Sequence, residues 1–144
     1  MKSYIIIILL GLSLCISRDR QRVVDCAKSA IGKAYVKGAH GPNTFDCIGL
    51  VRYCLAQIGK GANIGSVCHY QYTDQKGKYV EKANLQPGDA VFFSNNGPKS
   101  VQPGHVGIFI GNNAYINANS VVNKVVQATL STNRNYYGAR NFID

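Results

Sequence analysis

The stretch GHVGIFIGNNAYINAN, residues 104–119, carries the clearest structural pattern in the chain. From His105 to Ile110, a β-branched apolar residue occupies every second position, which is the period of a β-strand. Turn-forming residues follow at 111–113, and a second apolar run comes directly after them. The sequence therefore predicts an antiparallel β-hairpin.

The length of the hairpin loop decides which polar residues meet. A three-residue loop at 111–113 would pair the two residues that flank it, and it would make His105 and Asn117 diagonal neighbours on one face. A two-residue loop would put them on opposite faces unless a bulge intervened. In the first register Asn119 would lie directly opposite His105. The sequence therefore leaves both asparagines as possible partners of this histidine.

In the rest of the chain, predicted helices come before predicted strands. Apolar residues at helical spacing predict helices over about residues 19–32 and 48–58. Glycine, proline and asparagine at 35–46 predict a loop, and the polar segment 61–78 predicts a short helix and a turn. Further strands are predicted at about residues 89–94, 114–120, 124–130 and 136–143. This order indicates an α+β fold in which N-terminal helices pack on a central antiparallel sheet.

The segment TFDC, residues 44–47, places a cysteine at a predicted helix start. Asp46 is a suitable N-cap, and Cys47 falls in the first turn. The helix dipole stabilises negative charge there, so the pKa of a thiol can fall several units below its usual ~8.5. The alternative is a buried structural cysteine. Cys54 lies on the apolar stripe of the same helix. Because seven residues of helix rise about 10 Å, these two cysteines cannot form a disulfide.

The number of cysteines adds a constraint. Those that follow residue 17 are Cys26, Cys47, Cys54 and Cys68. An even number in a secreted chain first suggests two disulfides. If Cys47 is a nucleophile, however, at least one of the other three is unpaired. No C-x-x-C pair occurs, so we expect no structural zinc site and no other metal or cofactor.

A cysteine nucleophile needs a base, and the base needs a group that orients it. His105 begins the clearest strand beside a loop and is the best candidate for the base. His40 and His69 lie in polar segments and are expected to be surface residues. Asn117 is the candidate for the orienting group, and Asn119 is its competitor.

The first residues have the pattern of a secretory signal peptide. Lys2 precedes an apolar run over residues 4–16, which is too short to span a bilayer as a helix. Small side chains at Cys15 and Ser17 fit a cut before Arg18. A buried core strand or helix is the alternative for this run.

This pattern predicts a signal peptide at residues 1–17, a single catalytic domain at 18–144 and a secreted product. Lipid attachment at Cys15 is a second possibility. It is disfavoured because Leu14 stands where a lipid-attachment signal needs glycine, alanine or serine.

The chain is strongly basic, with a formal net charge of +9, and loss of Lys2 with the signal peptide would leave +8. Such a charge draws a protein toward anionic bacterial walls, acidic glycans or nucleic acid. No basic helix or aromatic motif supports nucleic-acid binding. We therefore expect a monomer with no nucleic-acid partner and no stable membrane anchor.

Three blocks resemble the NlpC-type cysteine peptidases, which are papain-like: FDCIGLV (45–51), QPGDAVFF (86–93) and GHVGIFIGNNAYINA (104–118). The resemblance spans about residues 31–118. It implies that Cys47 is the nucleophile, His105 the base and Asn117 the orienting residue. The third position is often histidine in this family, and asparagine is an accepted alternative.

The resemblance also implies a substrate. Tyr35 corresponds to a family tyrosine near the substrate pocket, and we place Asp46 and Ile48 at this pocket too. Ile48 stands where the family usually has serine. The implied substrate is bacterial peptidoglycan, cut in its stem peptides between γ-D-glutamate and the following diamino acid. The alternatives are an N-acetylmuramoyl-L-alanine amidase, as in the related CHAP group, and a catalytically inactive, basic wall-binding module.

Overall fold

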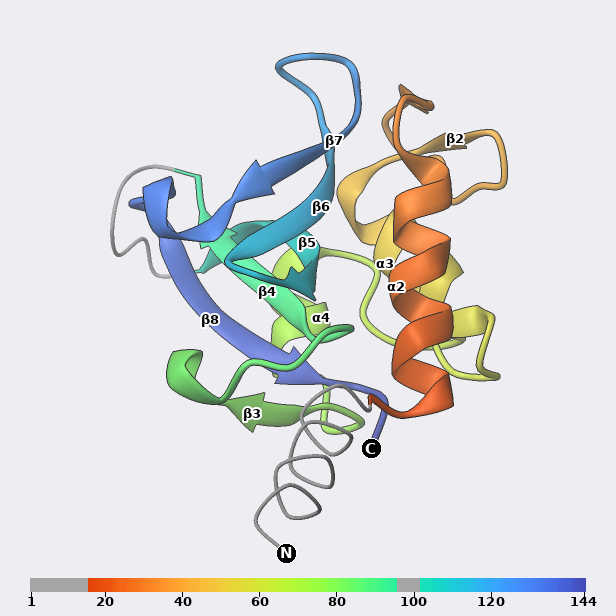
Figure 1. Cartoon of the computed structure of the whole chain (residues 1–144). Coiled ribbons are helices and arrows are strands. Elements are labelled where there is room, and N and C mark those ends of the chain that lie inside the picture. The colour runs from red at the N-terminus through yellow and green to blue at the C-terminus, as the bar shows by residue number, and fades with distance from the viewer. Residues whose placement is uncertain (1–15, 96–101) are drawn as a thin grey trace, which may run out of the picture.

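The computed structural model describes residues 16–95 and 102–144 (Figure 1). Its helices are α2 (Arg18–Ala30), α3 (Cys47–Ala56) and α4 (Cys68–Thr73), with short 3-10 helices at Lys82–Asn84 and Leu130–Thr132. Its strands are β1 (Ala34–Tyr35), β2 (Thr44–Phe45), β3 (Lys78–Val80), β4 (Ala90–Ser94), β5 (Pro103–Gly111), β6 (Ala114–Asn119), β7 (Lys124–Thr129) and β8 (Tyr136–Asn141). The predicted order, with the main helices before the main strands, is confirmed.

The described strands form one sheet in the order β2-β1-β7-β6-β5-β4-β8-β3. Every pairing is antiparallel except that of β1 with β2. Figure 1 shows α2 and α3 beside each other and against this sheet, and both helices contact β5. The fold is therefore α+β, with N-terminal helices packed on a mainly antiparallel sheet, as the sequence predicts.

Short strands at both ends of the sheet were not predicted. The segment expected to be only a loop, residues 35–46, contributes to β1 and contains β2, and these two-residue strands pair in parallel. At the other end, β3 pairs with β8. A strand of two or three residues is too short to show a period-two pattern, so these strands could not be predicted from the sequence.

The β5–β6 hairpin decides between the two loop lengths that the sequence left open. Gly111 pairs with Ala114, which leaves two loop residues rather than three. Both are asparagines with positive φ, as a tight hairpin turn requires. The ladder skips Ile110 as a bulge and then places Ile108 opposite Ile116. This is the two-residue loop with a bulge, and the bulge keeps His105 and Asn117 as diagonal neighbours on one face.

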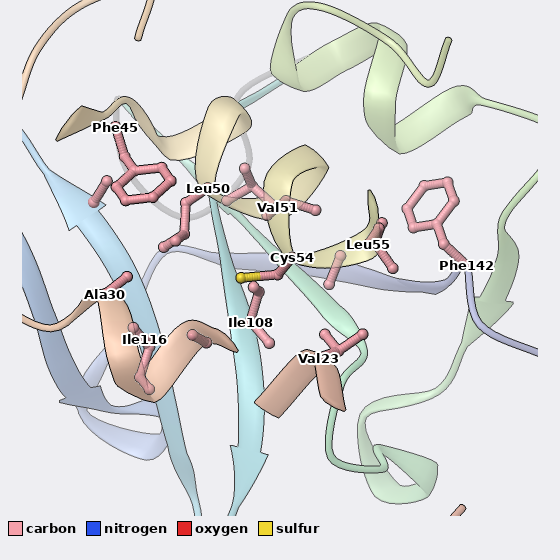
Figure 2. Packing of buried hydrophobic residues seen from close by; sticks show 14 of the residues in the cluster. Val23, Ala30, Phe45, Leu50, Val51, Cys54, Leu55, Ile108, Ile116 and Phe142 are labelled. Carbon is pink, nitrogen blue, oxygen red and sulfur yellow. The ribbon is translucent and has the colours of Figure 1, made fainter. Parts of the chain in front are cut away.

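The main core lies between α2, α3 and one face of the sheet (Figure 2). Leu50 and Leu55 from α3, Val23 from α2 and Ile108 from β5 are almost fully buried there. Successive strand residues point to opposite faces, and a second cluster forms around Phe93 on β4. Burial on both faces fixes the central strands, including the one that carries the predicted base.

A disulfide joins the two long helices within this core. Cys26 of α2 is bonded to Cys54 of α3, and their Cα atoms are 5.4 Å apart. Cys54 is completely buried, which confirms its predicted place in the core. The sequence left its bonding open. The disulfide couples α3 covalently to α2.

Hydrogen bonds between Arg20 of α2 and the QPGD turn (86–89) hold the start of this helix against the sheet. The buried Arg20 donates to Asp89 Oδ1 at 3.0 Å and to Asp144 Oδ2 at 2.7 Å. Burial raises the pKa of Asp89, and the hydrogen bonds from Gln86 and Arg20 oppose that rise. Asp89 is therefore a structural residue, which accounts for its place in the second sequence block.

The predicted signal peptide lies almost wholly outside the described residues. The described part of this segment ends with Ser17, whose hydroxyl accepts a hydrogen bond from Arg20 N and caps α2. Of the helices within residues 16–95 and 102–144, none is long and apolar enough to cross a membrane.

Candidate active site

Cys47 is partly exposed at the first position of α3. Asp46 is its N-cap, as predicted: Oδ1 accepts from Gly49 N at 2.7 Å, and Oδ2 accepts from Gly38 N at 2.9 Å. A Cβ on Gly49 would overlap the carbonyl oxygen of Ala39, so the first helical turn lies directly against the preceding loop. These contacts fix the position of the cysteine at the mouth of the helix.

The surroundings of Cys47 favour its thiolate. Its pKa is lowered to about 5, chiefly by a hydrogen bond with Cys68, and a hydrogen bond and the positive charge of His105 act in the same direction. Burial and the Asp46 carboxylate oppose this shift. Burial is also the largest influence on His105, where it favours the neutral ring. The contacts with Cys47 and Asn117 outweigh it, so the pKa of His105 rises above 6.5. Near neutral pH the two groups therefore form a thiolate–imidazolium pair.

His105 also contacts an asparagine, and the structure distinguishes the two that the sequence could not. His105 Nε2 lies 2.9 Å from Asn117 Oδ1. The amide of Asn117 is held in turn, because its Nδ2 donates to Val126 O at 3.2 Å. This second bond identifies Oδ1 as the atom that faces the ring. His105 therefore donates from Nε2, which leaves Nδ1 for the cysteine.

Asn119 has a different place. Its Oδ1 accepts from Val121 N at 2.8 Å, in the turn that leads to β7. Its Nδ2 lies 3.4 Å from Asn117 Oδ1, so it supports the asparagine that contacts the histidine. No hydrogen bond joins Asn119 directly to His105. Asn119 thus acts on the ring only through Asn117.

The three predicted substrate-binding residues all lie near Cys47. Tyr35 is half-buried, and its pKa is raised by burial and then by the negative charges of Cys47 and Asp46. Its phenol therefore keeps its proton beside the thiolate. Ile48 follows the cysteine and packs partly against the core. Both carboxylate oxygens of Asp46 already accept backbone bonds, as described above. A role in substrate binding remains a prediction for all three.

Cys68 is the residue near this centre that sequence reasoning missed. It begins α4, is buried, and has its Sγ 4.0 Å from the Sγ of Cys47. Its pKa is raised by its hydrogen bond with Cys47 and by burial, so this thiol keeps its proton and can donate it to the thiolate. The only available signal was the cysteine count, which required one unpaired cysteine but could not identify it.

A polar hollow lies beside His105. It has a volume of about 220 Å³ and is lined mainly by uncharged hydrogen-bonding side chains, which include Ser94, Asn95, Asn119, Ser120, Asn133 and Asn135. Among the described residues, no group of three or more histidine, cysteine, aspartate or glutamate side chains could hold a metal ion. The chemistry that these residues can perform is nucleophilic attack by a thiolate, assisted by an oriented imidazolium.

Comparison with known proteins gives the family. The model of the NlpC/P60 family matches residues 32–142. "Probable endopeptidase p60" of Listeria seeligeri is 38% identical over 96 residues, which are 67% of this chain and 17% of that protein. "Murein DD-endopeptidase MepH" of Escherichia coli K12 is 33% identical over 114 residues, which are 76% of this chain and 41% of that protein. The chain thus spans less than half the length of each of these relatives.

A solved structure agrees in fold. NlpC2 from Trichomonas vaginalis superposes with a TM-score of 0.79 at 24% identity, over 90% of this chain and 49% of that chain. The family match covers most of the chain, including the helix with Cys47 and the hairpin with His105 and Asn117. This chain belongs to the NlpC/P60 family.

Proposed function

We propose that this protein is a cysteine endopeptidase that hydrolyses the stem peptides of bacterial peptidoglycan. The observation that carries the proposal is the Cys47–His105–Asn117 arrangement: a cysteine at a helix start, a histidine that favours its thiolate, and an asparagine 2.9 Å from that histidine. Membership of the NlpC/P60 family and similarity to proteins named endopeptidases support the reaction class.

The first half of the reaction uses the ion pair. The Cys47 thiolate attacks the amide carbon, and negative charge develops on the amide oxygen. As the first residue of α3, Cys47 has a backbone N–H with no acceptor inside the helix, and this N–H can stabilise the oxyanion. His105 then gives its Nδ1 proton to the leaving amine. The products are a thioester on Cys47 and a free amino terminus.

The second half reverses the role of the histidine. His105 is now neutral and accepts a proton from a water molecule, which attacks the thioester and releases the carboxylate. Asn117 accepts the Nε2 hydrogen throughout and keeps Nδ1 directed at the reacting atoms. The thiolate and imidazolium are then restored, and no cofactor is consumed.

The bond that we propose is the one between γ-D-glutamate and the following diamino acid. The support is the resemblance to NlpC-type peptidases, in which a tyrosine lies where this chain has Tyr35. The net charge of +9 favours approach to an anionic wall. Tyr35, Asp46 and Ile48 surround the nucleophile and would contact the acyl part of the substrate.

One digestion tests this proposal against its alternatives. Purified peptidoglycan is incubated with the protein, and the products are identified by mass spectrometry. The proposal predicts new amino termini on the diamino acid. Amino termini on L-alanine would indicate an N-acetylmuramoyl-L-alanine amidase instead. Wall binding with no new amino termini would indicate a catalytically inactive binding module and would overturn the proposal.

We also propose that the protein is secreted and acts as a monomer. The apolar run over residues 4–16 and the Cys26–Cys54 disulfide favour an oxidising compartment. Cleavage before Arg18 would remove the Ser17 hydroxyl that caps α2, a loss that typically costs about 1 kcal/mol. Intact-mass measurement of the protein from culture medium tests both the secretion and the cleavage position. A product that remains inside the cells with Met1 attached would contradict them.

A further inference from the structure

The mechanism above leaves one buried reactive group without a step of its own, the thiol of Cys68. We propose that Cys68 is a resolving cysteine: when a peroxide oxidises Cys47, Cys68 forms a reversible disulfide with it, which switches the activity off and protects the nucleophile. This inference rests on the proposed function for its effect on activity. The chemistry of the two thiols can be tested without that function.

The geometry supports a bond between these two sulfurs. Their Sγ atoms lie 4.0 Å apart, so an approach of about 2 Å gives a disulfide of normal length. Cys47 is the first residue of α3 and Cys68 is the first residue of α4, so the two sulfurs meet where the N-terminal ends of these helices lie close together. The helix with Cys68 has only six residues.

No other partner in the described part of the chain competes for Cys47. Cys26 and Cys54 are bonded to each other, and Cys47 and Cys68 are the free cysteines of residues 16–95 and 102–144. The difference in solvent exposure between Cys47 and Cys68 determines which of them meets the oxidant first. Cys47 is partly exposed and can meet a dissolved oxidant, whereas Cys68 is only 6% exposed. Oxidation therefore begins at Cys47.

The proposed steps balance. The Cys47 thiolate attacks hydrogen peroxide; the O–O bond breaks, and sulfenic acid and hydroxide form, the hydroxide taking up a proton to give water. Cys68 sulfur then attacks the Cys47 sulfur; the S–O bond breaks, and a disulfide and a second water form. An added dithiol returns two electrons and two protons, restores both thiols and becomes a disulfide itself.

The first step also prepares the second. The pKa of Cys68 is raised first by its hydrogen bond to the Cys47 thiolate, then by burial and by the negative charge on that sulfur. Sulfenic acid carries no such charge. Oxidation of Cys47 therefore removes two of the influences that raise the pKa of Cys68, while burial still raises it, so the Cys68 thiolate forms more readily after the first step than before it.

The test maps the thiols by mass. The full-length protein is treated with hydrogen peroxide, its free thiols are alkylated, and the unreduced peptides are analysed. We expect a peptide pair joined through Cys47 and Cys68, with two hydrogens fewer than the separate peptides. Sulfinic or sulfonic acid at Cys47, with Cys68 still alkylated as a free thiol, would overturn the inference.

Variants and activity give an independent check. Cys68→Ser keeps a small hydrogen-bond donor, and its activity is expressed relative to its own value before oxidation. In the wild type, activity lost to peroxide should return when dithiothreitol is added; in Cys68→Ser it should not, because Cys47 proceeds to sulfinic acid. The double variant Cys26→Ser/Cys54→Ser is the matched control and should recover like the wild type. Equal recovery in Cys68→Ser would contradict the proposal.

These readouts separate the two hypotheses. A Cys47–Cys68 disulfide in a protein that never cleaves peptidoglycan would leave the inference standing and reject the proposed function. Cleavage by a protein that forms no such disulfide would do the reverse. Circular dichroism of each variant shows whether it has folded.

Discussion

The two ends of helix α3 hold two pairs of cysteines in different states. At the buried end, Cys54 is bonded to Cys26 and lies in an apolar core. At the N-terminal end, Cys47 lies 4.0 Å from Cys68, and both remain free thiols. Two helical turns thus separate a structural sulfur from a reactive one. The hydrogen bond with Cys68, the imidazolium of His105 and the start of the helix stabilise negative charge on the Cys47 sulfur, which the apolar core cannot do.

Exchange of the nucleophile should produce the largest effect. Cys47→Ala is expected to lower kcat/KM for a muropeptide by at least about 1000-fold, because no other group can form the thioester. Cys54→Ala should retain substantial activity, because that sulfur lies in the core. Release of product by each variant, followed by liquid chromatography, makes the comparison. If Cys47→Ala cleaved the muropeptide as fast as the wild type, Cys47 would not be the nucleophile.

Removal of the Cys26–Cys54 disulfide should lower the stability of the protein and leave its activity almost unchanged. The double variant Cys26→Ala/Cys54→Ala is expected to lose about 2–4 kcal/mol in the free energy of unfolding, because the bond closes a long loop. Its kcat at a temperature where it remains folded should stay close to that of the wild type. Urea denaturation measures the stability. Cys47→Ala is the control, and a loss of stability as large in that variant would remove the distinction between the pairs.

A smaller effect is expected from the group that orients the base. Asn117→Ala should lower kcat by about 10- to 100-fold with little change in KM, because the ring loses its acceptor but the substrate contacts remain. The upper limb of the pH–activity profile should also move to lower pH, because the bond to Asn117 favours the imidazolium. Asn119→Ala is the matched control and should have a weaker effect. The reverse order would show that the wrong asparagine has been chosen.

Several elements of the fold and of the site could be predicted from periodic patterns in the sequence. The helix with Cys47 and Cys54 and the hairpin with His105 and Asn117 are long enough to show their periods, and the cap at Asp46 is a local signal. The blocks that contain them also carry the family resemblance. These patterns place each side chain on its own element, which is why the predicted core position of Cys54 is correct.

The features that were missed depend on contacts between distant segments. The bond from Cys54 to Cys26 spans 28 residues, and the sequence left both Cys26 and Cys68 as possible partners. The approach of Cys68 to Cys47 depends on how the six-residue helix α4 is placed relative to α3. The spacing of apolar residues along the sequence does not indicate this placement. The bulge at Ile110 is a local feature that the sequence left open, because the residues around it have an ordinary strand pattern. Only the three-dimensional structure could supply these details.

The claim that Cys47 is an activated nucleophile is tested most directly by its rate of alkylation as a function of pH. Iodoacetamide is the reagent, and the mass of the Cys47 peptide is the readout, so that Cys68 is counted separately. Because the pKa of Cys47 is lowered to about 5, the rate should stay on its plateau at neutral pH and fall only as the pH approaches that value. In His105→Gln the midpoint should move upward, since one source of thiolate stabilisation is lost. A wild-type midpoint near the ordinary thiol value of about 8.5 would contradict the account.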